Sequence, residues 1–168
     1  IITAVKTRRE IVVITDTSVH SMQFIGPPFT FGITQLASNI TVRGFNSAVA
    51  VGDAIIWMGY DRFYVYDGRV QVLPCSVRDH VFQDFNETQS NKVYAGVNSA
   101  FGEVFWFYPS QTNAVSNNGT GENDKYVVYN YDQKIWYVGT LARSSWIDRG
   151  VYQYPMATDS NLVYNHEK

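Results

Sequence analysis

The residues that most often carry out chemistry are few in this chain and far apart. His20, His80 and His166 have no partner at metal-ligand spacing, and no Cys-x-x-Cys pair occurs. Cys75 is the one cysteine, and its nearest histidine is His80. A strand end and a helix five residues apart are poor positions for a nucleophile and its base. The sequence therefore predicts no catalytic residue, no metal site and no cofactor.

Acidic residues could still form a glycosidase site if two carboxylates converged. The aspartates instead stand beside predicted turns, where Asp usually hydrogen-bonds its own backbone. These residues are Asp16, Asp53, Asp61, Asp67, Asp132 and Asp159. Gly26-Pro27-Pro28 is no phosphate cradle, because its two prolines lack the N–H donors that such a site needs. A glycosidase-type propeller is kept as a second alternative, without a residue pair to support it.

Aromatic side chains are the most abundant candidates for binding, with 12 Tyr, 10 Phe and 4 Trp. Aromatic platforms stack on sugars or on unpaired bases. Alternation along a strand would point about half of these side chains into the packing between sheets, so we expect most of them in the core. The remainder could form an interaction face. The two groups are Trp57, Tyr60, Phe63, Tyr64 and Tyr66, and Trp106, Phe107, Tyr108, Trp136 and Tyr137.

Short β-rich runs separated by turns recur along most of the chain and would position these residues. Residues 48–73 contain four such runs, and Asp67-Gly68 is typical of a tight hairpin turn. Residues 94–138 repeat the pattern. Four-stranded units that start about 45 residues apart are typical of propeller blades.

The flanking residues 9–36 and 151–165 are interpreted as partial units. The sequence thus predicts an all-β fold of β-propeller-like, four-stranded antiparallel meanders, with about three to four blades. Residues 1–168 would form a single domain of this type or a fragment of one. Both chain ends have patterns typical of interrupted strands, so we expect a piece of a longer protein.

One segment, residues 76–85, has helical spacing of its apolar residues, and Ser76 with Asp79 resembles a capping box. A second helical turn is predicted to start at Asn86 or Thr88. Residues 110–125 are polar and lie between two strands, so we expect an exposed loop and the most disordered part of the chain.

Composition restricts the possible partners. The net charge of −2 argues against a surface devoted to nucleic acid. No run of about 18 apolar residues occurs, so no membrane span is predicted. If the protein lined a DNA channel, its arginines could touch phosphates, although we expect them to be simply solvated. These residues are Arg62, Arg69, Arg78, Arg143 and Arg149.

Two segments, TDTSVHSMQFIGPPF (residues 15–29) and WMGYDRFYVYDG (residues 57–68), resemble tail-associated virion proteins of tailed bacteriophages, including marine phages with short tails. The resemblance implies a longer, propeller-containing tail or head–tail component that assembles into rings and conducts DNA without catalysis. It further implies a virion protein that is made in the bacterial host cytoplasm.

The expected partners are therefore other virion proteins and further copies of the full-length chain. DNA would pass through a channel without sequence-specific recognition. The alternative is a carbohydrate-binding or host-attachment propeller that uses exposed aromatics.

Overall fold

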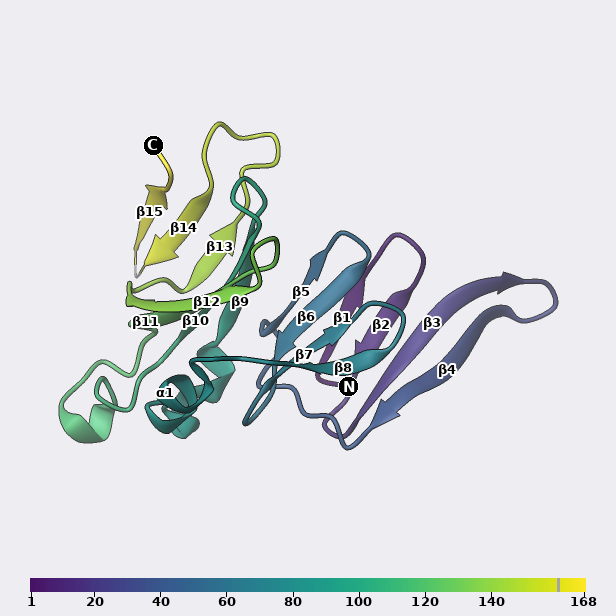
Figure 1. The fold of residues 1–168 in the computed structure, drawn as a ribbon, viewed down its shortest axis with the longest axis horizontal. Coiled ribbons are helices and arrows are strands. Elements are labelled where there is room, and N and C mark those ends of the chain that lie inside the picture. The colour runs from purple at the N-terminus through teal and green to yellow at the C-terminus, as the bar shows by residue number, and fades with distance from the viewer. Residues whose placement is uncertain (160) are drawn as a thin grey trace. The chain divides into compact units, whose positions relative to one another are not determined.

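The computed structural model describes residues 1–159 and 161–168 as an all-β protein with one short α-helix (Figure 1). The described strands lie in four antiparallel sheets. The chain divides into two compact units, unit 1 (Ile1–Pro74) and unit 2 (Cys75–Lys168), and each contains two of the sheets.

In both sheets of unit 1, each strand pairs with its neighbours in the sequence. Tight turns allow this meander, and Gly52 and Gly68 adopt positive φ angles of 62° and 111° in two of them. The first sheet contains β1 (Thr3–Lys6), β2 (Ile11–Ile14), β3 (Ser18–Gly26) and β4 (Thr30–Ser38). The second contains β5 (Ala48–Val51), β6 (Ala54–Met58), β7 (Phe63–Tyr66) and β8 (Val70–Leu73).

The core of unit 1 lies between its two sheets, and the first strands of the sheets, β1 and β5, contact each other. Trp57 is fully buried and stacks on Tyr64 with ring centroids 5.4 Å apart. Its indole Nε1 donates a hydrogen bond to the Thr41 carbonyl at 3.1 Å, which satisfies the polar atom of a buried ring. The buried cluster comprises Val12, Ile14, Val19, Val42, Ile55, Trp57, Tyr64 and Tyr66.

Unit 2 contains a four-stranded and a three-stranded meander. The four-stranded sheet consists of β9 (Tyr94–Asn98), β10 (Glu103–Tyr108), β11 (Lys125–Asn130) and β12 (Ile135–Thr140). The other consists of β13 (Ser145–Ile147), β14 (Met156–Asp159) and β15 (Leu162–Asn165). As in unit 1, the first strands of the two sheets, β9 and β13, contact each other.

Trp146 is the central contact between the sheets of unit 2. Its ring stacks on Phe105 with centroids 5.1 Å apart, and its Nε1 donates to the Val97 carbonyl at 2.8 Å. A β-carbon at Gly96 would lie 2.5 Å from Cδ1 of Trp146, so glycine is needed for this close approach. Trp146 therefore ties β13 to β9 by both packing and a hydrogen bond.

The predicted strand pattern is largely confirmed. Residues 48–73 form four antiparallel strands, and the second unit, predicted over residues 94–138, spans Tyr94 to Thr140. The partial unit predicted over residues 9–36 contains β2, β3 and most of β4, and β1 precedes it in the first sheet. In the last sheet, β13 was not predicted. Within the unit predicted over residues 151–165, residues 151–154 form turns and bends, and the two strands are β14 and β15.

The helical segments follow the first sheet pair along the chain. The predicted helix exists as α1 (Arg78–Gln83), but the capping box is wrong, because Val77 is the N-cap and no side chain caps the helix. A second helical turn is present as η1 (Glu87–Lys92), in which the Asn86 side chain accepts a hydrogen bond from Thr88 N. A short 3-10 helix, η2 (Val115–Asn117), lies in the polar loop.

Candidate protein-interaction site

The most exposed apolar feature of the described chain is the hairpin of β3 and β4. These strands have nine residues each, whereas β1 and β2 have four. Pairing between β2 and β3 ends at Ile11 and Met22, so residues 23–33 continue alone as a two-stranded arm (Figure 1). This part of the unit predicted over residues 9–36 is therefore a projection, and not a core strand.

The pairing register gives this arm two different faces. Phe24 pairs with Phe31, and the two rings meet edge to face with centroids 6.0 Å apart. Because side chains alternate between faces, the neighbouring pair of Met22 and Ile33 shares their face. The opposite face carries Ser21, Gln23, Gly32 and Thr34.

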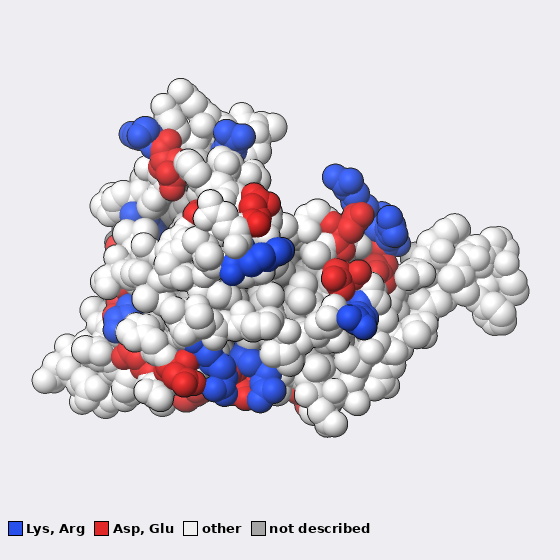
Figure 2. All heavy atoms as spheres, viewed as in Figure 1, with Lys and Arg blue, Asp and Glu red and all other residues white. Residues whose placement is uncertain are grey.

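The apolar side chains of the arm are open to solvent. The exposed fractions are 70% for Phe24, 57% for Ile25, 76% for Phe29, 54% for Phe31 and 71% for Ile33. The arm is the white projection at the right of Figure 2, and the chain has no Lys, Arg, Asp or Glu between Asp16 and Arg43. Ile25 lies on the opposite face, against Gly32. Exposed apolar surface of this kind is often an interaction site in soluble proteins.

A polar cluster fixes the base of the arm. The Glu10 carboxylate accepts hydrogen bonds from Ser21 and Gln23 on β3, and from the Tyr66 hydroxyl at 2.6 Å on the second sheet. Burial alone would raise the pKa of Glu10, but these hydrogen bonds outweigh burial and lower it. Burial and the bond to Glu10 raise the pKa of Tyr66 to about 12. Glu10 thus joins the two sheets where the arm begins.

A small cavity of about 160 Å³ lies beside the apolar face of the arm. The turn between β1 and β2 contributes Lys6, Arg8 and Arg9 to its lining, and the arm contributes Phe24 and Phe31. Arg9 also forms a 3.9 Å ion pair with Asp53. Cations therefore border the base of the arm but not its tip.

The aromatic groups predicted from the sequence are mainly core residues, as expected. Trp136 and Tyr137 are partly buried, and Tyr60 is exposed. The guanidinium of Arg43 lies over the Tyr60 ring, 4.9 Å from its centroid, and so covers one face of it. The buried members are Trp57, Phe63, Tyr64, Tyr66, Trp106, Phe107 and Tyr108.

The surroundings of the histidines and the cysteine differ from one residue to the next. His20 Nε2 is 2.9 Å from the Ser18 hydroxyl, and His80 is exposed on α1. His166 packs against Trp146 and accepts a hydrogen bond from Arg143 Nε at 3.0 Å. Burial raises the pKa of Cys75 to about 11, which disfavours the thiolate that a nucleophile needs.

Five of the six aspartates lie in turns or bends as predicted, and Asp159 ends β14. Asp61 is paired with Arg62 at 2.5 Å. Four of the five arginines named from the sequence are exposed, but the expectation of a solvated side chain is wrong for Arg143. Its guanidinium is buried over the Tyr164 ring, 4.2 Å from the centroid, and bonds to the Ala142 carbonyl.

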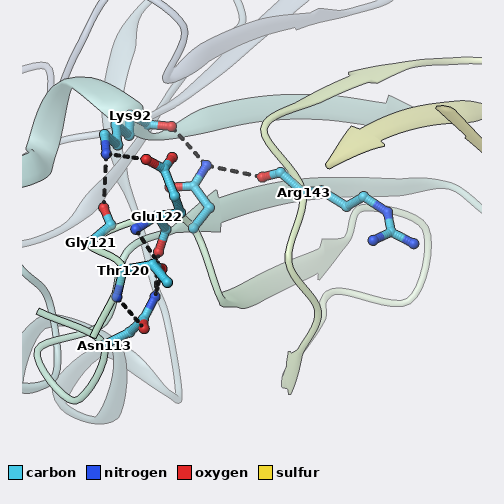
Figure 3. Close-up of polar contacts among 7 residues, drawn as sticks. Lys92, Asn113, Thr120, Gly121, Glu122 and Arg143 are labelled. Atoms are coloured by element: carbon cyan, nitrogen blue, oxygen red, sulfur yellow. Dashed lines mark hydrogen bonds and ion pairs between the residues drawn. The ribbon is translucent and has the colours of Figure 1, made fainter. Parts of the chain in front are cut away.

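The polar loop of residues 110–124 is folded onto unit 2 (Figure 3). The Asn113 amide bonds to Thr120 Oγ1 at 2.9 Å and to the Glu122 carbonyl at 3.0 Å. Lys92 Nζ bonds to the Gly121 carbonyl and forms a 2.6 Å ion pair with Glu122. Residues 115–118 are exposed as predicted, but the structure describes a hydrogen-bonded loop where disorder was expected.

The Asn123 side chain makes the deepest of these contacts. This residue is buried, and its Nδ2 bridges the carbonyls of Lys92 and Arg143 at 2.8 and 3.0 Å. Glu122, Asn123, Arg143, Ser144 and Asp159 line a polar cavity of about 320 Å³ nearby. The polar composition of the loop, which favours disorder on its own, supplies the partners that fix it.

Within residues 1–159 and 161–168, no cluster of three His, Cys, Asp or Glu side chains is arranged to hold a metal ion. No helix in this described part is long and apolar enough to cross a bilayer. Comparison with known proteins finds no protein-family model that matches the chain and no curated protein with significant similarity to it. The resemblance to phage tail proteins therefore stays a prediction.

Proposed function

We propose that this chain is a structural component of a phage or prophage virion, in the tail or head–tail region, and that it acts through protein–protein contacts without catalysis. The observation that carries the proposal is the exposed, uncharged β3–β4 arm. Other virion proteins and further copies of the chain would cover it, and DNA would pass through the assembled ring without being read.

The energetics of the arm support an assembly role. A typical monomer exposes a largest apolar patch of about 300–600 Å², and such patches are often functional. Phe24, Phe29 and Phe31 place three exposed rings of unit 1 in one hairpin that contributes little to the core. Contact with a partner would remove this surface from water, which gives the arm a function that folding alone does not.

The sheet order supports a propeller-like interpretation of the rest of the molecule. In each unit, two consecutive meanders stack with their first strands in contact, β1 on β5 and β9 on β13. Consecutive blades of a propeller are arranged in this way around a central channel. We therefore propose that the four sheets are blades of a larger, rigid assembly module.

Carbohydrate attachment has less support. Most members of the aromatic groups are in the core, and Arg43 covers one face of the exposed Tyr60 ring. A glycosidase would need two available carboxylates. Of the two that line the 320 Å³ cavity, Glu122 is paired with Lys92.

The proposal is tested on particles of the phage or prophage that encodes the chain. Mass spectrometry of gradient-purified virions should detect the wild-type protein at a fixed copy number per particle. The double substitution Phe29→Ser and Phe31→Ser should lower that copy number at least tenfold. Phe101→Ser, which alters a ring of unit 2 that is as exposed as Phe31, is the control and should be incorporated normally. Absence of the wild-type protein from purified particles would overturn the virion role.

A further inference from the structure

We propose that β4 pairs antiparallel with β4 of a second copy of this chain, about a two-fold axis that extends the first sheet across both copies. The inference rests on the proposed assembly function and names the partner of the arm. It is carried by a comparison of β4 with the other sheet edges of the same chain.

Edge strands that must not pair are usually short or carry charge. In the part of the chain that the structure describes, the edge strands other than β4 have three to six residues. Each also has a Lys, Arg, Asp or Glu within it or within two residues of one end. These strands are β1, β5, β8, β9, β12, β13 and β15.

β4 lacks both of these safeguards, and its one irregularity is a β-bulge at Leu36, which limits its regular edge to residues 30–35. It has nine residues, and Lys, Arg, Asp and Glu are absent from the strand and from the two residues on either side of it. Within the described sheets it pairs with β3 alone, so its outer backbone edge has no strand partner. The protections that the chain applies at its other edges are thus missing at its longest one.

The backbone of this edge favours a strand over a lipid surface. Unpaired N–H and C=O groups cost several kcal/mol each in hydrocarbon, so a two-stranded hairpin cannot enter a bilayer beyond its tip. A second β-strand instead satisfies these groups and covers neighbouring side chains at once. The basic residues near the base of the arm would permit contact with anionic lipid, so lipid binding is included in the test.

Self-pairing is compatible with the charge pattern. A two-fold axis places each strand opposite an identical strand, and like charges directly opposite each other would destabilise the pair. No such charge exists between Asp16 and Arg43.

The available area fits a second copy and sets the expected strength. The five exposed apolar side chains of the arm present roughly 600 Å², given about 150–250 Å² for a large aromatic side chain. Two arms bring together about 1,200 Å², the lower limit of stable, specific interfaces. We therefore expect a dimer in the micromolar range that forms with increasing concentration.

Sedimentation equilibrium of the full chain over a wide concentration range tests the pairing. The wild-type chain should dimerise, and Ile33→Lys on β4 should weaken the dimer at least tenfold. Val72→Lys is the matched control, because Val72 is 51% exposed on the edge strand β8 of the same unit. A wild-type chain that stays monomeric, or a dimer that Ile33→Lys leaves unchanged, would overturn the inference.

Disulfide cross-linking tests the geometry independently of the Lys variants. In a Cys75→Ser background, single cysteines at Thr30, Thr34 and Ser38 should cross-link between copies at unequal rates. Antiparallel two-fold pairing brings a residue beside its own copy only near the axis. Equal cross-linking at the three positions would indicate parallel pairing and would contradict the proposal, as would a dimer with no cross-link at any of them.

The two proposals fail in different ways. Virions that contain the protein while its β4 edge forms no dimer would leave the assembly function standing and remove only the self-pairing. Flotation with phosphatidylglycerol vesicles that Phe29→Ser abolishes, in a chain that stays monomeric, would replace the second copy with a lipid surface. Absence of the protein from virions would remove the assembly function.

Discussion

The two units differ in the segment that extends from each core. Both bury a tryptophan between two meanders and satisfy its indole N–H with a backbone carbonyl, Thr41 for Trp57 and Val97 for Trp146. Outside the core, unit 2 folds its polar loop onto itself through side-chain hydrogen bonds. Unit 1 instead extends an uncharged hairpin whose apolar side chains have no covering partner within the unit.

This difference separates residues that stabilise the fold from residues available for binding. In unit 2 the polar loop helps to stabilise the fold, since Asn113, Asn123 and Asp124 form hydrogen bonds with backbone groups. In unit 1 only the base of the arm, at Glu10, is tied to the core. Substitutions should therefore have large effects in the cores, moderate effects in the loop and little effect on the stability of the arm.

Truncation of the central tryptophans should have the largest effect. Trp57→Ala and Trp146→Ala should each lower the free energy of unfolding by about 3–5 kcal/mol, because a large cavity forms and a buried carbonyl loses its donor. Urea denaturation followed by circular dichroism measures this change. Tyr152→Ala, at a half-exposed ring, is the control and should cost under about 0.5 kcal/mol. Equal effects in the three variants would show that the tryptophans are not central to packing.

Gly96→Ala tests the close approach between β9 and β13. The added methyl group would lie 2.5 Å from the Trp146 ring, so the sheets must move apart. The expected cost is about 2–3 kcal/mol, typical of overpacking a core. Gly32→Ala is the control on the arm, where the new methyl group meets only the flexible side chain of Ile25 at 3.1 Å. A cost at Gly32 equal to that at Gly96 would contradict this account of the packing.

The sequence alone predicts the regular parts of this fold well. Residues 48–73 contain four short β-rich runs and have a glycine in each of two tight turns, so local chemistry specifies four strands. β13 was missed because Ser145-Trp146-Ile147 is too short to show alternation, and its place depends on the contact with Gly96. The predicted helix cap at Ser76 is wrong because α1 starts two residues later, at Arg78.

The candidate site could be predicted only in part. The alternation of residues 29–33 indicates a strand, but exposure depends on how far β2 extends, and β2 ends its pairing at Met22. The absence of charged residues from Thr17 to Val42 is unusual for a solvated hairpin, and this signal in the sequence could have indicated an interaction surface. The ordering of the polar loop depends on partners such as Lys92 and Arg143, which lie outside it in the sequence.

The polar loop should be the next most sensitive region. The Asp124 carboxylate accepts hydrogen bonds from Ser110 N at 2.8 Å and Ser110 Oγ at 2.7 Å, and Ser110 is fully buried. Asp124→Ala leaves both donors unsatisfied and should cost about 1–2 kcal/mol. Hydrogen exchange of loop amides should rise in parallel. Ser116→Ala, at an exposed position, should leave exchange in residues 110–114 nearly unchanged, and a similar rise there would contradict a specific role for Asp124.

The Glu10 carboxylate should make the free energy of unfolding of unit 1 more dependent on pH. Its pKa in the folded protein is below the ordinary value of 4.5, so its contribution is fully present above that value and is lost as the pH falls through the lowered pKa. The effect should stay below about 1 kcal/mol, because the group is partly solvated. Unfolding measured between pH 6 and pH 3 should show a shallower acid loss for Glu10→Gln than for wild type. An identical profile would show that Glu10 does not couple the sheets.

Substitution in the arm should have the smallest effect on stability, and this is the sharpest test of the comparison. Phe29 is 76% exposed, so folding transfers little of its ring from water, and Phe29→Ser should change the free energy of unfolding by less than about 0.5 kcal/mol. The measurement must be made at a concentration where the chain is monomeric, because binding to a partner would add to the apparent stability. If the same substitution destabilises the monomer by more than about 1 kcal/mol, the arm packs on its own unit and its apolar side chains are not free for a partner.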